Sequence, residues 1–85
     1  MGDKFDFGTA SRLVEAVNAT ASSLEMKNEQ LEKKFLNLRT GFNDSGYDKY
    51  AADMSVADTK IKDVIVQLKI VGKHISEYSE KLKGI

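Results

Sequence analysis

The chain has 85 residues, 13 of them basic and 13 acidic, and it contains neither cysteine nor proline. Chains of this length bury too little surface for two cores, so residues 1–85 are expected to form one domain. Zero net charge leaves no electrostatic footprint for nucleic acid, and the lack of cysteine excludes a disulfide framework. No segment has the roughly 18 apolar residues of a membrane span, so we expect no stable membrane insertion.

The N-terminal segment does not have the pattern of a cleaved signal peptide. Residues 1–8 lack a continuous apolar stretch after a basic start. We expect these eight residues to precede the first helix and Thr9 to cap it.

Apolar residues recur with a heptad spacing through the first half of the chain. Steps of four and three reach Ala10, Val14, Val17, Ala21, Leu24, Asn28, Leu31, Phe35, Leu38 and Phe42. This 3.5-residue period predicts a helix over about 9–41 that packs side by side with another helix. Asn28 is the one polar member. It either fixes register and partner choice or faces solvent where the bundle opens, and the sequence leaves both possibilities open.

A second heptad series fills the other half and predicts a helix over about 46–83. Its members are Tyr47, Tyr50, Met54, Ala57, Ile61, Val64, Leu68, Val71, Ile75, Tyr78, Leu82 and Ile85. Residues 64–71 are rich in β-branched side chains and could form a strand, but a lone strand would have no partner in this chain. Gly72 either admits a close helix or is merely tolerated, and we favour tolerance.

A turn is predicted at 41–46, where turn-forming residues are densest. Ser45 followed by Asp48 matches a capping box, so the second helix should begin near Gly46. The expected fold class is therefore all-α, a two-helix antiparallel hairpin. Because such a hairpin covers each apolar stripe from one side only, we expect two hairpins to pair into a four-helix bundle dimer.

The predicted partner interface lies along the two stripes. It consists of Leu24, Asn28, Leu31, Phe35, Ile61, Val64, Leu68, Val71 and Ile75. Val56, Val66 and Ile70 lie away from the stripe and predict a second apolar face. The substitution Leu68→Asp should abolish assembly, because it places a charge in the seam. The partner is an identical chain or a different helical protein.

Residues able to carry chemistry are sparse. His74 is the only histidine and is expected at the edge of the stripe with a solvated ring. The recurring aspartates lack the alternating spacing of a calcium loop, and no Gly-Lys-Ser/Thr follows Gly41 or Gly46. We therefore expect no catalytic residue, metal, cofactor or small-molecule substrate, and no enzymatic activity.

Two long helices around a mid-chain turn, with Tyr-Asp-Lys-Tyr-Ala-Ala-Asp-Met opening the second helix, resemble the WXG family. These are small early-secreted-antigen-like proteins of type VII secretion. The counterpart of the family's Trp-x-Gly turn is Phe42 with Gly46. The family's Tyr-x-x-x-Asp/Glu export signal has no counterpart, because Leu82 stands at that spacing from Tyr78.

The resemblance implies a bacterial protein that is cytoplasmic before export, is secreted without a cleaved signal peptide and forms four-helix dimers. It implies either a small secreted factor or a targeting partner, or chaperone, for a larger exported toxin such as one of the LXG type. The missing tail motif and the second apolar face favour the partner role. The alternative is a filament subunit resembling the needle proteins of type III secretion. Their turn carries Pro-Ser-Asx-Pro, whereas this chain has no proline.

Overall fold

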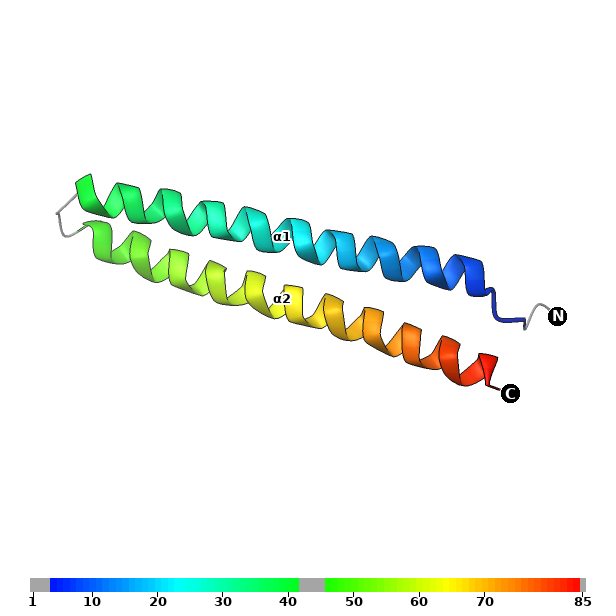
Figure 1. Cartoon of the computed structure of the whole chain (residues 1–85). Helices are drawn as coiled ribbons and strands as arrows, with labels where there is room; N and C mark the ends of the chain where they lie inside the picture. The colour runs from blue at the N-terminus through cyan, green and yellow to red at the C-terminus, as the bar shows by residue number, and fades with distance from the viewer. Residues whose placement is uncertain (1–3, 42–45, 85) are drawn as a thin grey trace.

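In the computed structural model the chain forms two antiparallel α-helices (Figure 1), which confirms the predicted helical hairpin. The structure describes residues 4–41 and 46–84. Helix α1 spans Phe7–Gly41 and helix α2 spans Gly46–Lys83. Residues 64–71 are helical throughout, so the strand alternative is wrong. The expected turn residue Phe42 and the expected cap Ser45 lie outside the described residues.

The first helix is capped by Asp6. The Thr9 backbone N–H donates to Asp6 Oδ1 over 2.9 Å, and the Ala10 N–H donates to the Asp6 carbonyl over 3.0 Å. Helix α1 therefore begins two residues earlier than predicted, and the assignment of Thr9 as the cap is wrong. A carboxylate at this position satisfies an unpaired amide and also opposes the helix dipole, which favours Asp6. The Thr9 N–H bond lowers the pKa of Asp6 below its ordinary value of 3.8.

The hairpin is long and thin. It measures 62 × 21 × 16 Å, and its radius of gyration is 19.2 Å, whereas a compact chain of this length would have about 12 Å. Its accessible surface is 6784 Å², roughly 1,800 Å² more than the ~5,000 Å² expected for a compact protein of this mass. Within the described residues the buried hydrophobic side chains are Ala10, Ala21 and Ile65. The hairpin thus has a seam between its helices but no broad core.

The seam follows the predicted stripe on α1 more closely than on α2. On α1 the residues facing α2 are Ala10, Val14, Val17, Ala21, Leu24, Asn28 and Phe35, all buried or half-buried. On α2 one predicted row is also half-buried: Tyr47, Met54, Ile61, Leu68, Ile75 and Leu82. The second row of the α2 seam is Ala51, Asp58, Ile65, Gly72 and Ser79, one residue after the predicted positions.

Small side chains explain this displaced row. Ala51, Gly72 and Ser79 let the two helices approach closely, whereas the predicted Tyr50 and Tyr78 would hold them apart. The two tyrosines are instead 62% and 54% exposed. This row of the predicted stripe on α2 is therefore exposed, and the row that follows it by one residue lies in the seam.

Gly72 lies in the seam, where a larger side chain would meet α1. It is buried, and a Cβ atom there would lie 3.0 Å from Asn18 Oδ1 and 3.7 Å from Val17 Cγ1. Both atoms belong to side chains and Asn18 is exposed, so alanine can be accommodated here and the interpretation that Gly72 is merely tolerated stays a prediction.

Substitution of Gly72 tests this close contact. Gly72→Ala should raise the free energy of unfolding by up to about 1 kcal/mol, because alanine favours a helix and the exposed Asn18 amide can rotate away. Gly72→Leu should lower it, because the larger side chain pushes the helices apart. Urea unfolding followed by circular dichroism at 222 nm measures both changes. Ala52→Leu, at an exposed position of α2, is the matched control. Wild-type stability of Gly72→Leu would contradict the close contact.

Candidate functional site

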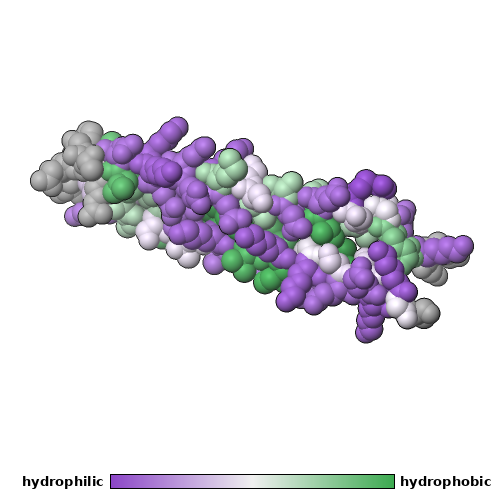
Figure 2. All heavy atoms as spheres, viewed as in Figure 1, coloured by the Kyte–Doolittle hydropathy of each residue, from purple (hydrophilic) through white to green (hydrophobic). Residues whose placement is uncertain are grey.

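The two helices present different long faces on either side of their seam. On one face, ion pairs link the helices: Lys62 Nζ lies 3.1 Å from Glu32 Oε2, and Lys69 Nζ lies 3.0 Å from Glu25 Oε1. We call this the ion-pair face. Figure 2 shows one side of the hairpin, where hydrophilic side chains run along both helices and hydrophobic areas are smaller.

A polar cluster sits within the seam beside the ion-pair face. Asn28 is only 4% exposed, and its Nδ2 donates to Asp58 Oδ1 over 2.8 Å. Lys62 Nζ lies 3.1 Å from Asp58 Oδ2 and bridges this carboxylate to Glu32. Of the two possibilities left open by the sequence, the solvent-facing Asn28 is therefore wrong. A single polar contact between facing helices favours one register, because any slip breaks it.

The electrostatics of this cluster keep it charged. The Asn28 amide and then Lys62 lower the pKa of Asp58 below its ordinary value of 3.8 by donating to its carboxylate. Hydrogen bonds to Asp58 and Glu32 raise the pKa of Lys62 above 10.5. Asn28 Oδ1 is buried and accepts no hydrogen bond from the described residues, so the amide costs stability while it fixes the register.

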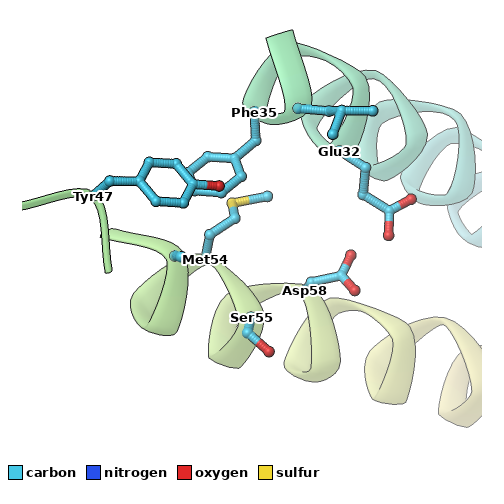
Figure 3. A pocket seen from close by; sticks show the side chains of 8 residues that line it. Glu32, Phe35, Tyr47, Met54, Ser55 and Asp58 are labelled. Atoms are coloured by element: carbon cyan, nitrogen blue, oxygen red, sulfur yellow. The ribbon is translucent and has the colours of Figure 1, made fainter. Parts of the chain in front are cut away.

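An open groove lies where the seam approaches the turn (Figure 3). Phe35 and Tyr47 stack with ring centroids 5.6 Å apart, and Met54 lies beside them. Glu32 and Asp58 lie at the other end of the groove with their carboxylates directed into it. Among the described residues no group of three or more His, Cys, Asp or Glu side chains is placed to hold a metal ion.

The opposite face of the hairpin carries exposed hydrophobic side chains, and we call it the apolar face. Its members are Leu31, Leu38, Tyr50, Val64, Val71 and Tyr78, which are 37% to 62% exposed. On α1, Leu31 flanks the seam on the side away from Glu25 and Glu32. On α2, Val64 flanks it on the side away from Lys62 and Lys69. Because these glutamates and lysines pair with one another, both apolar rows must lie together on the other side.

The predicted interface residues are thus divided between two surfaces. Six of them lie buried or half-buried in the seam of the same chain: Leu24, Asn28, Phe35, Ile61, Leu68 and Ile75. The other three, Leu31, Val64 and Val71, are exposed on the apolar face. The heptad spacing predicted a single interface along each stripe. It did not take into account the small residues beside the stripe on α2, which determine where α2 contacts α1.

The remaining predicted positions are on the outside of the hairpin. Val56, Val66 and Ile70 are exposed on α2, and His74 is exposed as well. Gly46 is the first residue of α2, whereas its expected motif partner Phe42 is outside the described residues.

Comparisons with models of protein families, with curated proteins and with solved structures find no match to this chain. Neither described helix is long and apolar enough to cross a membrane.

Replacing Asn28 tests whether the buried amide costs stability. Asn28→Leu should raise the free energy of unfolding by about 1 kcal/mol, because it removes a buried carbonyl oxygen that lacks a donor. Asn28→Ala should lower it by a similar amount, because it loses the hydrogen bond and leaves a void. Denaturant unfolding measures both changes. A Leu variant less stable than wild type would show that the Asn28–Asp58 bond outweighs the unpaired oxygen.

Acidification tests the Asp58 contact. Because folding lowers the pKa of Asp58, its contribution to stability is present above pH 3.8 and is lost as the pH falls through the lowered value. The stability difference between wild type and Asp58→Asn should therefore be largest near neutral pH and should shrink below pH 3.8. Denaturant unfolding at several pH values measures it, with Asp63→Asn on the outer surface as control. A pH-independent difference would contradict the assignment.

Proposed function

We propose that the protein acts through helix pairing, with its apolar face packed on a second pair of helices to form a four-helix bundle. One observation carries the proposal. Six large hydrophobic residues align on one face of the described hairpin, whereas its buried hydrophobic residues are two alanines and an isoleucine. Exposed apolar surface of this regularity marks interaction sites in small proteins.

The surface area of the hairpin supports this proposal. A standard interface removes about 800 Å² from each partner, and the hairpin exposes roughly 1,800 Å² more than a compact chain of its mass. A second helix pair on the apolar face would cover the rows that α1 and α2 leave exposed. Ile61 and Leu68 belong to the row of α2 that lies between the seam and the apolar face. Their side chains would then contact both α1 and the added helices, as core positions of a four-helix bundle do.

The biological role we propose is that of a WXG-like protein of type VII secretion. In this role it is a small secreted factor or a targeting partner, or chaperone, for a larger exported toxin. Support comes from the helical hairpin, from the likeness of residues 47–54 to the family, and from an apolar face suited to a helical client domain. The chain would act in the bacterial cytoplasm before export and leave without a cleaved signal peptide. Its chemistry would be limited to protein–protein contact.

Charges on the apolar face should abolish the association. The double variant Leu31→Glu with Val64→Glu should remain monomeric, because each substitution buries an unpaired carboxylate in the bundle. These positions are more informative than Leu68, which lies half-buried between α1 and α2, so that Leu68→Asp would also disturb the hairpin. Light scattering coupled to size-exclusion chromatography measures assembly, alone and after co-expression with a candidate client's helical domain.

Met26→Glu is the matched control, because Met26 is 63% exposed on the outside of α1. It should assemble as wild type does. If the double variant assembles as well as Met26→Glu, the apolar face is not the interface. Export of a client toxin from a type VII-competent host should fall with the double variant and persist with the control. Export unaffected by either variant would contradict the secretion role and leave the helix pairing intact.

A further inference from the structure

The border of the apolar face carries a basic charge that the structure leaves unpaired. Lys27 and Lys34 lie one helical turn on either side of Leu31, and Lys60 lies one turn before Val64. Lys81 follows Tyr78 by three residues on the same border. All four lysines are exposed, and within residues 4–41 and 46–84 none of them forms an ion pair.

Acidic residues on this border are fewer. Asp53 lies one turn after Tyr50, and Asp6 lies one turn before Ala10. The Asp6 carboxylate already accepts the Thr9 N–H as the cap of α1. On the ion-pair face, by contrast, Lys62 and Lys69 are paired with glutamates of α1. The border of the apolar face therefore carries more basic than acidic side chains, four lysines against two aspartates.

A second copy of the chain complements this border poorly. The cross-helix contacts Asn28–Asp58 and Glu32–Lys62 show which residues of α1 and α2 share a level along the hairpin. By this correspondence Lys27 lies level with Lys60, and Lys34 lies level with Asp53. If two copies met with their turns together, α1 of one would face α2 of the other. Each Lys34–Asp53 attraction would then be offset by a Lys27–Lys60 repulsion.

The reverse orientation is no better. With the turn of one copy over the chain ends of the other, Lys27, Lys34 and Lys60 would face a border that carries Asp6 and Lys81. Neither orientation supplies more acidic than basic side chains to the lysines. Border charges of helical bundles contribute little to affinity but decide partner choice, because like charges placed together are rejected.

Resting on the helix-pairing function proposed above, we infer that the apolar face selects a different helical chain whose apolar stripe is bordered by acidic residues. A second copy of this chain is the weaker partner. The acidic partner would pair with the three lysines near the turn while its apolar side chains cover Leu31 and Val64. Salt should weaken this preference, because the border remains exposed to solvent.

A charge-reversed form of the same chain provides a defined probe. The acidic-border variant carries Lys27→Glu, Lys34→Glu and Lys60→Glu, so it offers the same apolar face with an acidic border. Sedimentation equilibrium in low salt should show that wild type binds this variant about tenfold more tightly than either binds itself. The preference should shrink in high salt.

The matched control variant carries Lys33→Glu, Lys49→Glu and Lys73→Glu, which changes the net charge equally at exposed positions away from the apolar face. It should show no comparable preference for wild type. A third variant with Lys27→Gln and Lys60→Gln removes the like-charge pair and keeps the Lys34–Asp53 attraction. It should associate with itself more tightly than wild type does, which tests the inference even if the acidic variant does not fold.

The possible results separate the two proposals. Wild-type self-association as tight as the mixture, or an equal preference for the control variant, overturns the inference of an acidic partner and leaves helix pairing intact. Monomers in every sample, including the mixture, overturn the helix-pairing function itself.

Discussion

Two long helices that pack only on each other bury a narrow strip of side chains on each helix. This limit on burial determines which residues of the hairpin are left exposed. In this hairpin the strip is narrow, because α1 and α2 meet through small residues such as Ala21 and Gly72. Close contact of this kind gives good packing at the seam but little apolar burial. The rest of each heptad stripe is displaced sideways, onto one face, where water or another protein must contact it.

The other side of the seam is organised differently. There Asn28 and Asp58 join the helices by a hydrogen bond, and Lys62 and Lys69 reach across to glutamates. Exposed ion pairs add little stability, but a buried amide with one donor satisfied makes any other register costly. The hairpin therefore has one side that fixes how its helices align and one side left open for association. Lysines border the open side as well, and among the described residues Lys27, Lys34 and Lys60 form no ion pair there.

The helical hairpin itself was predictable from the sequence, because heptad spacing over two long segments and one turn-rich stretch leave few other folds. The helix start was missed, since Asp6 and Thr9 are both acceptable caps and only the path of the chain selects between them. The division of the stripe was also missed. A heptad pattern gives the period of the apolar residues, but it does not show which of them pack against the other helix of the hairpin and which are left exposed. The division depends on the size of residues such as Ala51 and Ser79. The pairing of Asn28 with Asp58 needed the register of one helix against the other, which neither segment alone contains.

We expect the hairpin to be completed by helices packed on its apolar face. Thermal unfolding followed by circular dichroism over a wide range of protein concentration tests it most directly. We expect a low unfolding midpoint for the isolated chain that rises with concentration, and a larger rise when a complementary helical partner is added, because association stabilises the folded state. A high midpoint that is independent of concentration, in a chain that sediments as a monomer, would contradict it.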